Sequence, residues 1–476
     1  MTHPEATRSS GRPGLLAVTG GTLLALAVGA AVAAPGSTGR QGALALMLVP
    51  LGVSAVVGLP LATFAVALLT ACQVGAWRVP IAGFHFLPEH FVVAGFVAAL
   101  LVRHRHTVIR SPAAYEVLLL AWVLWSALTS IAYSVDRARS LGVVGWQLLA
   151  WLILWGIRSW FLSEPTQGRK ALQAGMAAAA VVGFGAFVLW LAALGGLFRV
   201  GVQHDFVTGT VAARGLSYEA NLFASLELCW LFLALRWRVV NDARTPEWQL
   251  AGLVLGIVSS MTRAAWIAAI LIIAVTFFAI HDQRRRAEHA GSGVRRRRRA
   301  SRPLKWIVGA VLLVLLVAPA GRKFQAVFDF GSSTGAERVK TWKVAADDLT
   351  ASRGWVLGRG TNSFGQRHLS RTVAGQPDYL GNLALTVLYD TGIVGLILFG
   401  GTMVAFVLHR HLGWGRYFKL LFVTALLIVG AAASPIWFGY VWVTIAAIDT
   451  EWQHEHFEEG ALNPVPDSER LGPRDA

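Results

Sequence analysis

The stretch that decides the fold is GRGTNSFGQRHLSRTVAGQPDYLGN, residues 358–382, which runs directly into the apolar stretch LALTVLYDTGIVGLILFG, residues 383–400. The first stretch is too polar to lie in lipid, whereas the second is long enough to form most of a membrane helix. The polar part begins earlier, with GRKFQAVFDF at residue 321. We therefore predict an extracytoplasmic domain over 321–382 that is held above a bundle of membrane helices.

The composition places the chain among membrane proteins. Its 476 residues are 55% hydrophobic and 14% charged, and the mean hydropathy is +0.55. A soluble core of this size needs far less apolar surface, so we expect an all-α polytopic membrane protein. The first apolar run, 14–34, is long enough to remain as a helix without cleavage. Cys72 and Cys229 both fall within predicted spans and predict neither a disulfide nor a metal site.

The net charge of +16 lies largely in short segments between apolar runs. These basic segments are 103–106, 236–238, 284–286, 295–299 and 409–411. The positive-inside rule places them in the cytoplasm. Since no basic patch is interleaved with aromatic residues, we expect no nucleic-acid partner.

Fourteen candidate spans satisfy this topology with both termini in the cytoplasm, and several are short, so we predict 12–14 transmembrane helices. The candidates are 14–34, 42–57, 59–77, 86–102, 113–133, 143–161, 172–197, 221–236, 246–261, 264–281, 304–320, 383–408, 417–432 and 434–449. The predicted parts are an N-terminal bundle over 1–320 with a basic cytoplasmic linker at 282–303, the loop domain 321–382, C-terminal helices over 383–449 and a cytoplasmic tail at 450–476.

Two arginines fall on the predicted outer side, next to apolar runs. Arg214 precedes one span, and Arg263 lies at the turn of a helical hairpin. An arginine at this depth either snorkels to the interface or meets an anion. Two guanidinium groups at one boundary favour a phosphate or diphosphate headgroup, which they bind bidentately. Nearby, Glu219 and Asn221 either cap a helix or line a polar site.

Within the loop domain, ERVKTWKVAADDL at 337–349 predicts an amphipathic helix suited to a membrane surface. Val339, Trp342, Ala346 and Leu349 share one side of it, and Arg338 and Lys343 lie elsewhere. His368 follows a glycine-rich turn; such a histidine is either structural or a general base near neutral pH.

The order of these motifs resembles the O-antigen ligase and polysaccharide polymerase superfamily, over roughly residues 80–410. The motifs are RGLSYEANLFA, the hairpin MTRAAW, a loop that opens with Arg followed by Trp, and a turn bearing Gly358, Gly360 and Phe364. The next span carries Asp390, Gly392 and Gly395. The family typically closes the loop with His-Asn-x-x-Leu-x-x-Leu-x-Glu-x-Gly. This chain matches with Asn382, Leu385, Leu388 and Asp390, but has Gly381 at the place of the histidine.

The resemblance implies a GT-C-like fold and a lipid-linked glycan transferase of the bacterial cytoplasmic membrane, active on its extracytoplasmic face. The implied donor is a polyprenyl-diphosphate-linked glycan, and the acceptor is a hydroxyl of a glycan or lipid. No cofactor or metal is implied, because the donor carries its own leaving group. Membrane lipids surround the site.

The residues implied for substrate binding are Arg214, Arg263, Arg338, Asn221, Asn382 and Asp390. In the family the loop histidine assists the acceptor, so here the resemblance leaves that role to Asp378, His368 or Glu219, unless the protein is a divergent polymerase or inactive.

Two other classes of function stay open. A transporter or flippase of a lipid-linked glycan predicts ionisable residues in the middle of the spans. The sequence predicts span middles nearly free of such residues, which favours an enzyme. A non-catalytic partner in envelope assembly is the third possibility.

Overall fold

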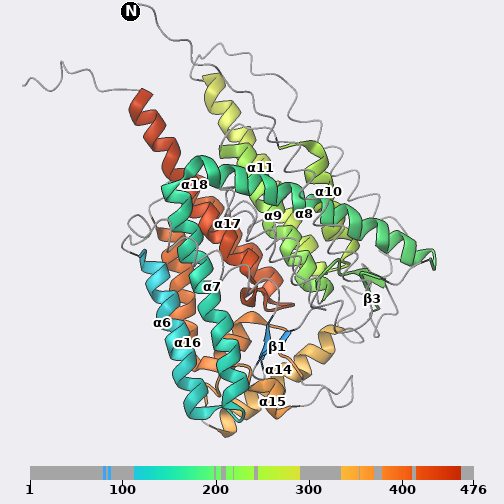
Figure 1. Cartoon of the computed structure of the whole chain (residues 1–476), viewed down its shortest axis with the longest axis vertical. Helices are drawn as coiled ribbons and strands as arrows, with labels where there is room; N and C mark the ends of the chain where they lie inside the picture. The colour runs from blue at the N-terminus through green and yellow to red at the C-terminus, as the bar shows by residue number, and fades with distance from the viewer. Residues whose placement is uncertain are drawn as a thin grey trace, which may run out of the picture.

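The chain folds into a bundle of helices with two short hairpins, as the computed structural model shows (Figure 1). The structure describes residues 79–81, 84–86, 112–197, 200–204, 211–217, 219–240, 245–289, 334–352, 354–368, 378–409 and 414–462. The helices are α6 (Ala114–Tyr133), α7 (Arg137–Ser163), α8 (Pro165–Leu194), α9 (Ala220–Val240), α10 (Glu247–Ser259), α11 (Arg263–His289), α14 (Thr334–Ala351), α15 (Phe364–Arg367), α16 (Leu383–Leu408), α17 (Trp414–Gly430), the 3-10 turn η2 (Pro435–Trp437) and α18 (Gly439–Leu462).

The strands form two antiparallel hairpins. β1 (Val79–Ile81) pairs with β2 (Phe84–Phe86), with Val79 opposite Phe86. β3 (Val202–His204) pairs with β4 (Val211–Ala213), with Val202 opposite Ala213. The second hairpin lies in the segment 198–220 that the sequence places between two spans.

Five of the described helices are long and apolar enough to cross a membrane: α6, α7, α8, α11 over Arg263–Asp282, and α16. This confirms the all-α polytopic membrane fold. The nine candidate spans from 113–133 to 264–281 and from 383–408 to 434–449 all contain helix. The other five lie outside the described residues, apart from Phe86, which ends β2. The total of 12–14 helices therefore stays a prediction.

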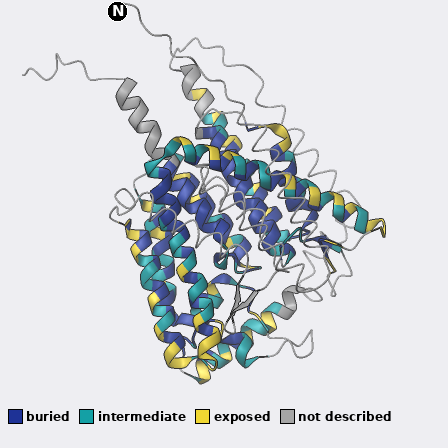
Figure 2. Cartoon of the chain, viewed as in Figure 1, coloured by how far each residue is buried: buried dark blue, intermediate teal, exposed yellow. Residues whose placement is uncertain are grey.

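The bundle has two ends, which we name by what lies there (Figure 1). The loop end carries α14 and α15, and the tail end is where α18 reaches its C-terminus. Buried residues line the interior of the bundle, and exposed ones face outward (Figure 2). The exposed residues on the long helices include large apolar ones such as Leu124, Val188 and Ile397. Such side chains suit contact with lipid tails, as expected for membrane helices.

Small residues allow α8 and α10 to pack closely. A Cβ atom added to Gly183 would lie 2.3 Å from the carbonyl oxygen of Gly252. A Cβ atom on Gly252 would lie equally close, at 2.3 Å, to the carbonyl oxygen of Ala180. Close backbone approach through small residues is the usual way in which helices associate in lipid.

Candidate functional site

The glycine-rich turn of the loop domain is inserted into a break in α16. The backbone N–H of Gly360 donates to the carbonyl of Asp390 at 2.9 Å, and that of Ile393 donates to Trp355 at 2.8 Å. The break lies at Gly392, whose φ of 67° and ψ of −171° are not helical. A Cβ atom on Gly392 would lie 2.2 Å from the Val356 carbonyl oxygen. Only glycine fits there, because of both the positive φ and the close backbone.

Asp390 holds this turn from within α16. The residue is 3% exposed, and its carboxylate accepts hydrogen bonds from the backbone N–H groups of Asn362 and Ser363. Gly358 lies directly against it, since a Cβ atom there would be 2.4 Å from the Asp390 carbonyl oxygen. The structure thus gives Asp390 a role in positioning the loop domain. Its predicted contact with substrate stays a prediction.

Helix α14 packs onto the turn and onto α16. Its Ala345 and Leu349 form a small core with Phe364, Leu380 and Tyr389, separate from the core of the bundle. This confirms the helix predicted over 337–349. On the predicted apolar side, Leu349 is buried against Tyr389 of α16, whereas Val339 is 59% exposed. Contact of this side with a membrane surface stays a prediction.

Asp348 on α14 contacts several polar side chains in and around the turn. It accepts a hydrogen bond from the Tyr389 hydroxyl, and lies 3.3 Å from the Arg359 Nη2 and 3.6 Å from the His368 Nε2. Burial raises the pKa of Asp348, but the Tyr389 hydrogen bond and the charges of Arg359, Arg367 and His368 outweigh it and lower the pKa. His368 also packs on Phe364, with ring centroids 4.6 Å apart. The structure therefore uses His368 to hold the loop domain together.

Arg338 lies beside Gly381, the residue at which the resemblance implies a histidine. A Cβ atom on Gly381 would be 3.7 Å from the Arg338 Nε and 3.9 Å from its Cζ. One turn further along α14, the Trp342 Nε1 donates to the Leu380 carbonyl at 2.9 Å, which fixes this helix to the segment before α16. At the start of α9, burial raises the pKa of Glu219, and the Arg338 charge opposes that rise. The contacts of Arg338 and Trp342 join α14 to the segment before α16.

The hairpin bearing Arg263 joins the same end of α9. The Thr262 hydroxyl donates to the Asn221 Oδ1 at 3.2 Å, so the start of α11 is tied to the first turn of α9. The backbone N–H of Arg214 donates to the Gly201 carbonyl at 2.9 Å, which holds the approach to α9 against the β3–β4 hairpin.

The structure thus connects most of the predicted site residues at the loop end. Arg338 lies beside Gly381, and Asn221 of α9 accepts from Thr262, the residue before Arg263. Asn382 is the N-cap of α16 and accepts from the backbone N–H of Leu385 at 3.0 Å. The Asp378 carboxylate accepts from the next backbone N–H, that of Tyr379, at 2.9 Å. Asp390 and His368 lie instead in the turn described above.

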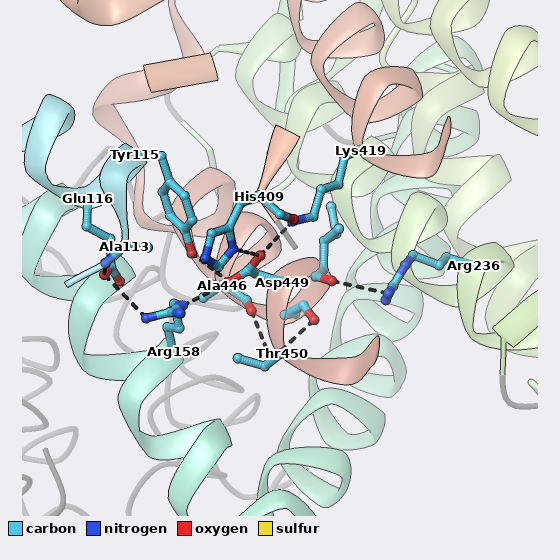
Figure 3. Close-up of polar contacts among 12 residues, drawn as sticks. Ala113, Tyr115, Glu116, Arg158, Arg236, His409, Lys419, Ala446, Asp449 and Thr450 are labelled. Carbon is cyan, nitrogen blue, oxygen red and sulfur yellow. Dashed lines mark hydrogen bonds and ion pairs between the residues drawn. The ribbon is translucent and has the colours of Figure 1, made fainter. Parts of the chain in front are cut away.

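A second cluster of charges, at the tail end, was not predicted (Figure 3). It surrounds Asp449 of α18, and each of its carboxylate oxygens has two partners. Oδ2 accepts from the Tyr115 hydroxyl and the Arg158 Nε, both at 2.9 Å. Oδ1 accepts from the Lys419 Nζ at 2.6 Å and lies 2.9 Å from the His409 Nδ1. The cluster joins α6, α7, α17 and α18 with the end of α16, and both Asp449 and Lys419 are 0% exposed.

Glu227 is an exception to the prediction that span middles are nearly free of ionisable groups. It lies in the middle of α9 and is 0% exposed. It fits between two glycines: a Cβ atom on Gly183 would lie 3.3 Å from its Oε2, and one on Gly256 would lie 3.0 Å from its Cδ. The sequence signal was a single Glu inside LFASLELCW, which a hydropathy average conceals.

The comparisons with known proteins bear on the loop end. Residues 249–400 match a family model. That family is O-antigen ligase. The match confirms the predicted resemblance to the O-antigen ligase and polymerase superfamily. It covers α10, α11, α14, the inserted turn and most of α16, and so includes Arg263, Arg338 and Gly381. No curated protein and no solved structure matches the chain.

Within the part of the chain that the structure describes, no three His, Cys, Asp or Glu side chains are arranged to hold a metal ion. That the reaction of an O-antigen ligase-like site here needs no metal or cofactor stays a prediction.

Proposed function

We propose that this O-antigen ligase-like membrane protein transfers a glycan from a polyprenyl-diphosphate donor to an acceptor hydroxyl, at the loop end of the bundle. The reaction needs two kinds of group. Cations must stabilise the negative charge that grows on the diphosphate as the glycosidic bond breaks, and a base must accept the hydroxyl proton. We place both at the loop end, on the extracytoplasmic face of the bacterial cytoplasmic membrane.

The observation that carries the proposal is the position of Arg338 beside Gly381. The guanidinium lies 3.7 Å from the place of a Cβ atom on Gly381, at the loop closure, where the resemblance implies a histidine. The Thr262–Asn221 hydrogen bond brings the start of α11, with Arg263, to the same end of α9. We assign the donor diphosphate to Arg338 and Arg263, with Arg214 on the approach to α9. Guanidinium groups suit this task because they bind phosphate oxygens bidentately.

The donor supplies its own activated bond, so the protein's task is to hold and stabilise charge. Interactions that strengthen as the diphosphate departs lower the barrier, whereas those equally strong in the bound substrate do not. The apolar surfaces of the long helices accommodate the polyprenyl tail in the membrane.

The test replaces Arg338 with alanine in cells whose own copy of the gene is deleted and whose surface glycan is measured by length and amount. We expect the glycan product to decrease about 10²–10³-fold, the usual effect of removing one donor to a developing charge. Arg139→Ala is the matched control, because Arg139 is an exposed arginine beside the start of α7 at the same end. Normal glycan in Arg338→Ala cells with normal protein levels contradicts the proposal.

A second candidate is a transporter or flippase of the same lipid-linked glycan. It is favoured by Glu227, which places an ionisable group in the middle of α9, as membrane transport routes require. Liposomes containing the purified protein separate the two candidates. Movement of the lipid-linked glycan across the bilayer without any new glycosidic bond supports the transporter.

A further inference from the structure

A buried carboxyl lies where α8, α9 and α10 meet (Figure 1). It belongs to Glu227 of α9, which is 0% exposed. A Cβ atom on Gly256 of α10 would lie 3.0 Å from the Glu227 Cδ and 3.0 Å from the Gly183 Cα of α8. The carboxyl therefore occupies a notch, which exists because both neighbouring helices have a glycine at this place.

The notch offers no partner for a negative charge. Within the part of the chain that the structure describes, neither carboxyl oxygen of Glu227 has a hydrogen-bond partner. The sequence of α8 from residue 171 to 194 contains no charged residue, and neither does that of α10 from 248 to 259. A carboxylate here would be surrounded by apolar side chains and helix backbone.

The titratable groups on the other helices that pack against α9 lie elsewhere or have other partners. Lys419 and Asp449 belong to the tail-end cluster. The Tyr440 hydroxyl of α18 donates to the Leu222 carbonyl at 3.4 Å, and Arg263 begins α11. On α9 itself, Arg236 donates to the Ile448 carbonyl at 3.1 Å.

One carboxyl oxygen of Glu227 shares its surroundings with a backbone carbonyl. A Cβ atom on Gly183 would lie 3.3 Å from the Glu227 Oε2 and 2.3 Å from the Gly252 carbonyl oxygen, so both oxygens lie around one point. An ionised carboxylate only accepts hydrogen bonds, as a carbonyl does, so the two groups would repel each other. A protonated carboxyl has a hydrogen to donate. A buried carboxyl without a partner takes up a proton instead of staying charged.

We propose that this junction is a proton-binding site. Glu227 holds a proton in the folded protein at neutral pH, and the neutral carboxyl allows α8, α9 and α10 to pack together. A metal ion such as Ca²⁺ or Mg²⁺ takes about six oxygen ligands, more than the carboxyl and the Gly252 carbonyl supply. The ligand that fits is therefore a proton. This assignment does not rest on the proposed function.

The proton site lies on the helix that leads to Arg263. Gly256 is followed by Ile257, whose carbonyl accepts from the Trp266 Nε1 of α11 at 3.1 Å, so α10 and α11 are joined as one hairpin. Loss of the proton places a negative charge against the Gly252 carbonyl and separates α10 from α9. The hairpin that carries Arg263 is then held less firmly.

The protonation state is measured by infrared spectroscopy on the full chain in lipid nanodiscs at neutral pH. A protonated carboxyl and a carboxylate absorb at different frequencies, and the band of the protonated form shifts in D₂O. We expect the difference spectrum between the wild type and Glu227→Gln to contain the band of one protonated carboxyl. Glu247→Gln is the matched control, because Glu247 is an exposed glutamate in the first turn of α10. Its difference spectrum contains a carboxylate band.

Thermal unfolding measures whether the fold holds the proton. The unfolded chain exposes Glu227 to water and releases the proton above the ordinary pKa of a glutamate, about 4.3, so the wild type becomes less stable as the pH rises. From pH ~6 to pH ~9 we expect its unfolding temperature to decrease by about 5 °C more than that of Glu227→Gln. Glu227→Met, with a neutral side chain of similar size, follows Glu227→Gln, and Glu247→Gln follows the wild type.

The effect on the hairpin is measured with a cysteine in place of Met261, which is buried at the turn between α10 and α11. At pH ~9 we expect a water-soluble maleimide to label Met261→Cys about tenfold faster in the wild-type background than together with Glu227→Gln. At pH ~6 the two rates are equal. Comparing the two backgrounds at one pH removes the effect of pH on the thiol itself, and mass spectrometry identifies the labelled peptide.

Several outcomes overturn the assignment. One is a carboxylate band for Glu227, and another is a stability difference between the wild type and Glu227→Gln that does not change with pH. An unfolding temperature that rises with NaCl but not with KCl, and does so only when Glu227 is present, assigns the site to a sodium ion instead. Equal labelling of Met261→Cys in both backgrounds at pH ~9 overturns the link to the hairpin. None of these outcomes depends on whether the protein transfers a glycan.

Discussion

The loop end and the tail end of this bundle both contain charged residues from helices far apart in the sequence. The two ends differ in how far these residues are buried and in how many partners they have. At the tail end, Asp449 is fully buried and both of its oxygens have two partners. At the loop end, Arg338 is partly exposed and lies beside Gly381, with a guanidinium that can meet another group. A saturated cluster holds helices together, whereas an accessible cation is suited to an anionic ligand. We therefore infer that the tail end stabilises the fold and that the loop end carries out the chemistry.

The largest expected effect is on the stability of the tail end. Asp449→Ala leaves the Arg158 and Lys419 charges buried without their carboxylate, which typically costs about 3–5 kcal/mol. Unfolding in detergent micelles, followed by helical circular dichroism, measures the loss. Lys343→Ala, on the exposed face of α14, serves as the control. Transfer per folded molecule stays close to wild type, and a selective loss of transfer with full stability would contradict the division between the two ends.

Arg338→Ala is expected to have the opposite profile. Glycan transfer decreases about 10²–10³-fold, as for other donors to a developing charge. The free energy of unfolding changes by less than about 1 kcal/mol, because the guanidinium is partly exposed to solvent. The same unfolding assay and a transfer assay, run on one preparation, give both numbers. A large loss in the free energy of unfolding would show that Arg338 is needed for the fold, and would contradict its role in transfer.

Gly392→Ala tests how the loop domain is attached. The backbone conformation of Gly392, with φ of 67° and ψ of −171°, costs any other residue about 1–3 kcal/mol, and the added Cβ atom would collide with the Val356 carbonyl. We expect the turn to detach from α16, with a loss of about 2 kcal/mol and a loop domain that proteases cut more readily. Gly400→Ala, at a position in α16 where a Cβ atom has open space, is the matched control. Equal protease resistance in both variants would contradict the attachment.

Asp348→Asn is expected to have the smallest effect. The Asp348 pKa is lowered in the fold, so its carboxylate stabilises the loop domain above the pKa of the unfolded chain. That contribution is lost as the pH falls through the folded value. Because the pairs with Arg359 and His368 are partly exposed, the loss amounts to about 1 kcal/mol or less. Protease resistance of the loop domain at neutral and acid pH measures it; a variant as acid-sensitive as the wild type would contradict the role of Asp348.

Much of the fold could be predicted from the sequence, because long apolar runs have few alternatives to a membrane helix. The candidate span 383–408 coincides with α16. The predicted start of a helix was wrong where the first turn of that helix is polar. α7 begins at Arg137, where the sequence placed 143, because the side chain of Asp136 caps the helix before its apolar part starts.

The sites were harder to predict, because they depend on contacts between distant segments. The separate motifs around Arg338 and Gly381 could be identified, but not the contact between the two residues. The tail-end cluster left a weaker signal: Glu116 and Asp449 fall near the predicted cytoplasmic ends of their spans, where basic residues also gather. Assigning those basic residues to loops concealed the pairing. The insertion of the turn at Gly392 is a matter of backbone shape, which no residue pattern specifies on its own.

The measurement that tests the central claim most directly is a transfer assay in proteoliposomes that compares the wild type with Arg338→Ala and Asp449→Ala. The donor is a polyprenyl-diphosphate glycan from the same cells, and both the new glycosidic product and the released polyprenyl diphosphate are quantified. We predict equal amounts of product and released lipid diphosphate for the wild type, near-complete loss with Arg338→Ala, and transfer per folded molecule retained with Asp449→Ala. Equal transfer by the wild type and Arg338→Ala, or passage of the donor across the bilayer with no bond broken, would contradict the account.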